Sequence, residues 1–447
     1  MMEKNHNKQR EHFRTRFGFI IACIGSAVGM ANIWMFPYRT GKFGGAAFLI
    51  PYFIFVILLG FSGVIGEMAF GRSVKTGPLG AFAKAMEMRF GEKSRKWGRL
   101  IGMIPVLGSL GIAIGYSVVV GWVIKYLAAA LTGQLTTIKN MGSFFGDLAV
   151  DFGSIGWHMT GLAITFTIMI LGITRGIEKM NKLMMPVFFI FFMVLFIRVA
   201  TLPGASAGYR YLFVPNWKQL ASVDTWVYAL GQAFFSLSLA GSGTIVYGSY
   251  LKDDMDIVSS AKNVAFFDTC AALLAGMVVI PAVFAFGLDV ASGPPLMFIT
   301  LPAVFQQMPA GWLFAIVFFI AVLFAAITSL MNLFETPIEA LQEQFQLSRI
   351  QAVGIVAAIA AVVGIFIESG DSVGAWMDAV SIYIIPLGAL LAGIMFYWVC
   401  PKGYAKKQAE MGAKKPLGNW FLPLTKYVFV GITLVVYVLG IFFGGIG

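Results

Sequence analysis

Gly25-Ser26-Ala27-Val28-Gly29-Met30-Ala31-Asn32 interrupts an otherwise apolar run, residues 17–38, with small and polar side chains. A second run, residues 227–249, is interrupted at the same mid-run position by Ser236-Leu237-Ser238-Leu239-Ala240-Gly241-Ser242-Gly243. Glycine in a helix interior costs roughly 1 kcal/mol relative to alanine, so both segments are places where a helix can open. Either segment alone is equally compatible with a close-packed helix face, since small residues let helices approach.

The interrupted runs belong to a series that extends along the whole 447-residue chain. Each run has roughly 17 to 25 residues, enough for a helix to cross about 30 Å of hydrocarbon, and none alternates as a β-barrel strand would. The chain is 59% hydrophobic and 12% charged, which is too little charge for a soluble surface. We expect an all-α integral membrane protein with eleven transmembrane helices, forming a single transmembrane domain over residues 1–447. The predicted spans are residues 17–38, 45–70, 98–132, 157–174, 183–201, 227–249, 262–288, 311–345, 350–367, 374–399 and 421–445.

The two interrupted spans are the first and the sixth, so they occupy corresponding positions in two sets of five. Glycine-interrupted spans in that relationship indicate an inverted-repeat transporter with its binding site at the interruptions. The first repeat would cover about residues 13–201 and the second about residues 227–399. The last span, about residues 421–445, would be peripheral.

The positive charge is distributed unevenly along the chain. The net charge is +11, and most of the 32 Lys and Arg residues fall at the N-terminus or in alternate loops, most densely in Arg72–Arg99 and Lys402–Lys415. This positive-inside pattern predicts a cytoplasmic N-terminus, and an odd number of spans then places the C-terminus outside. Residues 1–16 do not resemble a cleavable signal peptide. We expect a multi-pass protein of the cell inner (plasma) membrane, in contact with the lipid bilayer, with no nucleic-acid partner and no obligate protein partner.

Residues suited to catalysis or to transition-metal binding are few and dispersed. The three cysteines lie far apart, without the paired spacing of a disulfide framework or a CxxC site. His6, His12 and His158 occupy polar or end-of-span positions, form no pair, and are expected at the surface or the membrane interface. The sequence therefore predicts no enzymatic activity. An ion channel is also disfavoured, because a lidded binding site would obstruct flow.

An unwound helix in mid-membrane exposes backbone groups that lipid cannot satisfy, so another group must occupy them. Carbonyls facing one way suit a hard cation, and amides at the start of the next half-helix suit a carboxylate. An amino acid with a neighbouring sodium ion fits both ends of such a break.

The residues at the breaks also carry a family resemblance. GSAVGMANIWMFPY (Gly25–Tyr38), GKFGGAAFLIPY (Gly41–Tyr52), FFSLSLAGSGTIVYGSY (Phe234–Tyr250) and AAITSL (Ala325–Leu330) resemble helices of the neurotransmitter:sodium symporters, over about residue 10 to the tenth span. Eleven spans are typical of bacterial members. The resemblance implies the five-plus-five inverted-repeat (LeuT-like) fold with helices 1 and 6 unwound. It also implies symport of a hydrophobic or aromatic L-amino acid with two sodium ions, by alternating access.

Two sodium sites are implied by the same motifs. The site between spans 1 and 8 would use Gly25, Val28, Ala325, Thr328 and Ser329. The other site would use Ala27, Asn32, Ser236, Asp268 and an oxygen of the substrate carboxylate. Taken without the partner motif, the adjacent hydroxyls of Thr328 and Ser329 are equally explained by bonds back to carbonyls of their own helix.

Asp268 stands out independently of the resemblance. It lies in an apolar stretch, where a charge is costly and indicates a function by default, and no basic residue shares that stretch. The family usually has an asparagine near this position, and its chloride-dependent members bind chloride nearby. Asp268 therefore replaces chloride, ligates sodium, or does both, and we predict no chloride requirement.

The resemblance also implies a substrate site. Its residues would be Ala27, Met30, Ala31, Ile112, Tyr116, Phe235, Ser236, Ser238, Gly241, Ser329 and Leu333. Within that set, the Tyr116 hydroxyl would hold the carboxylate and Phe235 would close over the substrate. An apolar pocket rejects charged side chains. Glycine at position 241 leaves room for a bulky aliphatic or aromatic side chain.

Gates and a hinge are implied less completely. Arg10 and Glu343 match a cytoplasmic ion pair of the family. Asp378 matches the acidic member of an outer gate, but Met35 stands where the family has its arginine, so a water-mediated gate or packing of Met35 is expected instead. The spacing Gly176-x9-Pro186 resembles an element that unwinds to let water reach the inner sodium.

Two alternatives keep this fold but change the activity. A proton-coupled carrier would be supported by a lysine in place of the Thr328-Ser329 pair, and the sequence has none there. A nontransporting amino-acid sensor is equally compatible with the motifs, and uptake measurements would distinguish it from a carrier.

Overall fold

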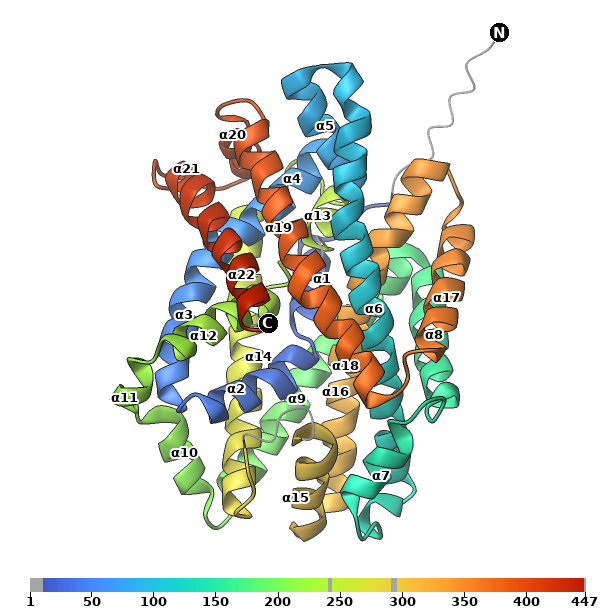
Figure 1. Cartoon of the computed structure of the whole chain (residues 1–447), viewed down its shortest axis with the longest axis vertical. Helices are drawn as coiled ribbons and strands as arrows, with labels where there is room; N and C mark the ends of the chain where they lie inside the picture. The colour runs from blue at the N-terminus through green and yellow to red at the C-terminus, as the bar shows by residue number, and fades with distance from the viewer. Residues whose placement is uncertain (1–10, 240–242, 291–295, 446–447) are drawn as a thin grey trace.

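The computed structural model describes residues 11–239, 243–290 and 296–445. Every element within those ranges is helical, and the helices form one bundle (Figure 1). Figure 1 shows α1 and α13 in the interior of the bundle, with α8 and α17 on one flank and α3, α10 and α11 on the other. In the labels, η marks a short 3₁₀ or π segment.

The first half contains a broken span, three long apolar spans and the shorter helices α5, α7 and α8. They are α1 (Arg16–Ala27), η1 (Ala31–Met35), α2 (Phe36–Lys42), α3 (Ala46–Leu59), η2 (Gly60–Val64), α4 (Ile65–Val74), α5 (Pro78–Phe90), η3 (Glu92–Ser94), α6 (Arg95–Leu131), η4 (Gln134–Thr136), α7 (Met141–Leu148), α8 (Ile155–Ile170), η5 (Ile173–Glu178) and α9 (Lys179–Ala200).

The second half repeats the broken span and adds the peripheral C-terminal helices. Its elements are α10 (Ala205–Phe213), α11 (Trp217–Leu220), α12 (Val223–Ser236), α13 (Gly243–Ser249), α14 (Ile257–Ala285), η6 (Leu296–Thr300), α15 (Leu301–Gln307), α16 (Gly311–Phe345), α17 (Arg349–Ile365), α18 (Gly370–Ala379), η7 (Val380–Ile384), α19 (Ile385–Ile394), η8 (Met395–Val399), α20 (Tyr404–Glu410), α21 (Phe421–Pro423), η9 (Leu424–Phe429) and α22 (Val430–Phe442).

The predicted fold class is confirmed. Within the described residues, seven helices are long and apolar enough to cross a membrane, and eight are when α1 and the η1–α2 unit count as one bent span. The remaining predicted spans coincide with the shorter apolar helices α8 and α17, and with α12 and α13 on either side of residues 240–242. The prediction of eleven spans is consistent with these elements.

Several predicted helix starts are too late. Helix α6 begins at Arg95 rather than residue 98, and α14 begins at Ile257 rather than residue 262. The reason is that polar turns continue a helix beyond its hydrophobic stretch when they are capped. At α14 the Asp256 carboxylate accepts a 2.9 Å hydrogen bond from the Ser259 amide, which satisfies an N-terminal donor of the helix.

Both predicted helix breaks are present. Helix α1 ends at Ala27, Val28 is extended, and the chain re-forms a helix at Ala31 with a bend of 53°. At the second break α12 ends at Ser236, and Ser238 has a left-handed φ of 54°. Helix α1 packs against α9, α14 and α16, so its break lies inside the protein, where exposed backbone groups can find partners.

The expected interfacial position of His158 is wrong. Its side chain is fully buried, with Nδ1 3.3 Å from Glu368 Oε1 and Nε2 2.9 Å from the Ser117 hydroxyl. The second Glu368 oxygen accepts the Ser154 amide at 3.0 Å. The residue does lie near the end of α8, but α6 and the turn before α18 cover it. His158 is buried by segments that are distant in the sequence, so the residues around it could not predict its burial.

Replacing Glu368 with alanine is expected to lower the stability of the fold by about 3 kcal/mol, because it leaves the buried Ser154 amide and His158 without their acceptor. Thermal unfolding of the purified protein in detergent measures this loss. Glu368→Gln keeps an acceptor at this position and should lose less, and Glu92→Ala, at an exposed position, is the control. An unchanged unfolding midpoint in Glu368→Ala would contradict the role of this cluster.

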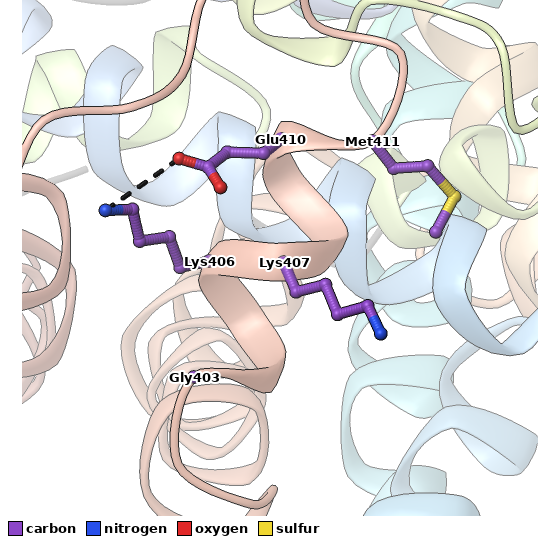
Figure 2. A pocket seen from close by; sticks show the side chains of 5 residues that line it. All are labelled: Gly403, Lys406, Lys407, Glu410 and Met411. Atoms are coloured by element: carbon purple, nitrogen blue, oxygen red, sulfur yellow. Dashed lines mark ion pairs between the residues drawn. The ribbon is translucent and has the colours of Figure 1, made fainter.

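The basic loop after η8 forms a surface hollow. Figure 2 shows Lys406 and Lys407 pointing to opposite sides of α20, with Lys406 Nζ 3.8 Å from Glu410 Oε1. The hollow has a volume of about 510 Å³ and is lined by Gly403, Lys406, Lys407, Glu410 and Met411. The buried Arg72 anchors α20 by donating to the Gln408 carbonyl. This hollow is separate from both helix breaks and shares no lining residue with the cavity beside them.

Candidate functional site

A cavity of about 670 Å³ lies beside the two breaks, between α1, η1, α6, α16 and α18. Nine of the predicted substrate residues line it: Ala27, Met30, Ala31, Ile112, Tyr116, Phe235, Ser238, Ser329 and Leu333. Gly241 lies outside the described residues. Ser236 is fully buried and does not line the cavity. The cavity continues past Met35 to Asp371, in the first turn of α18, and to Asp378, near the end of that helix.

Tyr116 links α6 to the first break. Its hydroxyl oxygen accepts a 2.9 Å hydrogen bond from the Met30 amide. Because the oxygen acts as the acceptor here, the phenolic proton is left to donate to another group in the cavity. The amide and the phenol therefore lie together where a carboxylate would be received.

The Ser26 carbonyl joins the two breaks to α16. The Ser238 hydroxyl donates to it at 2.9 Å and the Ser329 hydroxyl at 3.2 Å. Thr328 behaves differently: its hydroxyl bonds back to the carbonyls of Phe324 and Ala325 at 2.9 and 3.0 Å. The Thr328 hydroxyl therefore bonds within its own helix, whereas the Ser329 hydroxyl bonds across to α1.

The predicted sodium residues of α1 and α16 lie close together. A methyl group added to Gly25 would lie 3.0 Å from Thr328 Cβ, so the two helices almost touch there. Val28 and Ala325 are fully buried on either side of this contact. Within the described residues no group of three His, Cys, Asp or Glu side chains could hold a metal. A cation at this place would therefore be held by neutral oxygens.

Asp268 lies at the centre of a second buried cluster. The Asn32 amide donates to Asp268 Oδ1 at 2.7 Å, and the Ser236 hydroxyl donates to Oδ2 at 2.6 Å. All three side chains are fully buried. Among the described residues Asp268 forms no salt bridge, so its charge is balanced only by dipoles from α12 and the η1 segment. A buried carboxylate with only neutral partners is costly to ionise, and a nearby cation would offset that cost.

The end of the cavity at α18 carries charges on Arg39 and Lys42 that sequence reasoning missed. Met35 and Asp378 both line the cavity, as do Arg39 and Lys42. Arg39 is 6% exposed, and its guanidinium lies 5.6 Å from the centre of the Tyr228 ring. The signal was present in the sequence, because Arg39 follows Met35 by four residues and so shares its helix face.

The end of the bundle where α1 begins carries a buried ion pair. Arg349 binds Glu335 through two hydrogen bonds of 2.9 and 2.8 Å, and the Tyr250 hydroxyl donates to Glu335 at 2.7 Å. Phe13 packs edge-on against Tyr250, with ring centres 6.4 Å apart. Glu335 is an ionisable residue within an apolar helix, and that signal could have identified it.

The predicted inner gate is only partly observable. Glu343 lies on α16, where a methyl group added to Gly80 would meet its carboxylate oxygen at 2.5 Å. Its predicted partner, Arg10, lies outside the described residues. The Arg10–Glu343 pair therefore stays a prediction.

Comparison with known proteins identifies the family. The model of the sodium:neurotransmitter symporter family matches residues 10–143 and 145–444. The chain belongs to this family. It is thus a multi-pass membrane protein of a sodium-dependent transporter family, not of an enzyme family.

Individual relatives agree with this assignment. An uncharacterized sodium-dependent transporter of Bacillus subtilis is 37% identical over 324 residues, which cover 72% of this chain and 70% of the relative. An uncharacterized sodium-dependent transporter of Methanocaldococcus jannaschii is 30% identical over 437 residues, covering 92% and 87%. The crystal structure of MhsT in complex with L-phenylalanine superposes with a TM-score of 0.84 at 32% identity, covering 96% of this chain and 99% of MhsT. The LeuT-like fold predicted from the sequence is confirmed by this likeness.

Proposed function

We propose that this symporter imports hydrophobic or aromatic L-amino acids together with two sodium ions, without a need for chloride. The observation that carries the proposal is the position of the cavity. It lies beside both helix breaks, with the Tyr116 hydroxyl and the Met30 amide at its inner wall. The similar MhsT was crystallised with L-phenylalanine, which is a substrate of this chemical class.

The two ends of a zwitterionic amino acid match different parts of this wall. The substrate carboxylate would take a hydrogen bond from Tyr116 and from amides at the start of η1, where the helix dipole favours an anion. The ammonium group would face carbonyls at the end of α12. Ile112, Phe235 and Leu333 would surround the side chain, and such apolar walls exclude charged substrates.

The two sodium ions would occupy the two oxygen-rich places already described. One lies between Gly25, Thr328 and Ser329, and the other lies beside Asn32 and Asp268. At the second place the ion would also touch the substrate carboxylate, so each solute would raise the affinity for the other by the same factor. The Asp268 carboxylate would then both ligate sodium and supply the negative charge that chloride supplies in other members.

The two ends of the bundle are in opposite states, one open to the cavity and one closed. This difference supports transport by alternating access. The cavity reaches the α18 end of the bundle, while Glu335, Arg349 and Tyr250 close the other end. With the N-terminus in the cytoplasm of the inner membrane, the closed end faces inward. Phe235 would cover the bound substrate, after which the inner contacts break. Two sodium ions moving through about 100 mV supply about 4.6 kcal/mol, enough for a concentration ratio of about 10³.

Uptake into proteoliposomes tests this proposal. Labelled phenylalanine or tryptophan should accumulate only with an inward sodium gradient, in chloride-free buffer, and leucine should compete. Binding of the amino acid without uptake would instead identify a sensor. The absence of both sodium-dependent binding and uptake of any amino acid would refute the assigned substrate and coupling.

Tyr116→Phe is expected to raise the substrate concentration for half-maximal uptake at least tenfold, because a hydrogen bond to a charged group contributes about 1.5–3 kcal/mol. Tyr126→Phe is the matched control. Tyr126 lies on the same helix, and its buried hydroxyl has no hydrogen-bond partner among the described residues. Equal effects of the two substitutions would argue against a role of Tyr116 in binding the carboxylate.

A further inference from the structure

Asn181, on α9, has a side-chain oxygen that the fold leaves unsatisfied. The residue is fully buried, and its Nδ2 donates to the Ile177 carbonyl at 2.8 Å. That bond to a carbonyl fixes the nitrogen, so the oxygen is the atom on the other side of the carboxamide. Within the described residues Oδ1 has no hydrogen-bond partner. A buried acceptor without a partner costs about 1–3 kcal/mol, so its retention calls for an explanation.

The unsatisfied oxygen lies against Gly25, two residues before the end of α1. A methyl group added to Gly25 would lie 1.9 Å from Asn181 Oδ1 and 3.0 Å from Thr328 Cβ. Gly25 is therefore the point at which α9 and α16 both press against α1. Only glycine leaves room for the carboxamide there, and any side chain at position 25 would displace it.

Several hydroxyl and carbonyl oxygens lie around Gly25. The Thr328 hydroxyl lies 3.0 Å from the Ala325 carbonyl, and Ser329 donates to Ser26 at 3.2 Å. All of these oxygens are neutral. The carboxylate of Glu178, at the end of η5, is already bound by Lys182 at 2.5 Å and by the Arg14 amide at 2.7 Å. A small hard cation is the ligand that binds to neutral carbonyl, hydroxyl and amide oxygens together.

We propose that Asn181 Oδ1 is an additional ligand of the sodium ion bound between Gly25 and Thr328, so that this ion links α9 to α1 and α16. The inference rests on the proposed sodium coupling, but it adds a ligand from α9, where the sequence assigned water access to the ion and no ligand. The ion satisfies the buried carboxamide oxygen, and the oxygen in turn raises the affinity for the ion. Sodium release then requires α9 to separate from α1.

Sodium alone is a sufficient probe of this ligand. The thermal stability of the purified protein is measured against sodium concentration, without substrate and with choline chloride keeping the ionic strength constant. Asn181→Leu, which removes the oxygen, should raise the half-saturating sodium concentration about tenfold. Asn181→Asp, which keeps the shape and adds a negative charge beside the cation, should lower it. A ligand of sodium should shift the half-saturating sodium concentration in opposite directions in the two variants, whereas a residue that only packs should not.

A buried polar control accompanies both variants. Thr165→Val removes a fully buried hydroxyl that bonds only to the Gly161 carbonyl of its own helix among the described residues, so it should leave the sodium dependence unchanged. If both Asn181 variants melt earlier but keep the wild-type half-saturating sodium concentration, the residue is structural and the inference is wrong. If the wild type itself shows no stabilisation by sodium, the proposed coupling fails as well.

Discussion

Asp268→Ala is expected to abolish sodium-dependent accumulation of substrate in chloride-free buffer. The carboxylate holds Asn32 and Ser236 through charge-assisted bonds of 2.7 and 2.6 Å, and it is the only carboxylate of this buried cluster in the described residues. Each such bond contributes about 1.5–3 kcal/mol, so its loss should raise the half-saturating sodium concentration at least ~100-fold. Sodium titration of uptake, at a fixed substrate concentration, measures the change.

Asp268→Asn distinguishes the roles that the sequence left open, because it keeps the shape and removes the charge. If chloride restores uptake in this variant, the carboxylate replaces chloride. If chloride has no effect and the sodium dependence stays weak, the carboxylate acts as a sodium ligand. Asp253→Ala is the control, since the side chain of Asp253 is 66% exposed and pairs with Lys75 on the surface. Wild-type uptake by Asp268→Ala would contradict both roles.

Glu335→Ala is expected to open the inner end of the protein. The substitution leaves Arg349, whose side chain is 12% exposed, without its two-point partner and removes the acceptor of Tyr250. Breaking a buried ion pair costs about 3–5 kcal/mol, which corresponds to a shift of about 10²–10⁴ in the equilibrium between the closed and open states of this end. The ion pair lies at the closed end, so its loss raises the free energy of the closed state.

A native thiol reports this opening. Cys23 lies on α1 and is 2% exposed, whereas the other two cysteines can be replaced by serine. In the absence of sodium, maleimide should label Cys23 about 100-fold faster in Glu335→Ala than in the same background with Glu335 intact. Glu92→Ala, at an exposed position, should not change the rate. An unchanged rate in a folded Glu335→Ala protein would mean that the pair does not hold the inner end closed.

The breaks of spans 1 and 6 could be predicted because their cause is local. Glycine and serine in mid-span weaken a helix wherever it is packed, and α1 and α12 do end within the quoted segments. The nine cavity residues could be named for a different reason, since the resemblance to the symporter family implied each of them. Helix starts were predicted less well, because a capped polar turn such as that at Asp256 looks like a loop in composition.

Composition indicated which residues are costly to bury, but not which partners they find. Asp268 could be singled out from its apolar surroundings, yet its contact with Asn32 joins residues 236 positions apart. His158 was misplaced because Glu368 lies 210 positions away. Arg39 was overlooked because the sequence motif drew attention to Met35 instead.

The sequence by itself therefore determined the membrane class and the two unwound helices, since these depend on hydrophobic length and local helix propensity. Only the tertiary structure decided which polar groups meet: Asp268 with Asn32, Glu335 with Arg349, and the Asn181 oxygen with Gly25. The physical reason is that burial in lipid makes a polar side chain require a partner, whereas the packing of distant helices selects that partner.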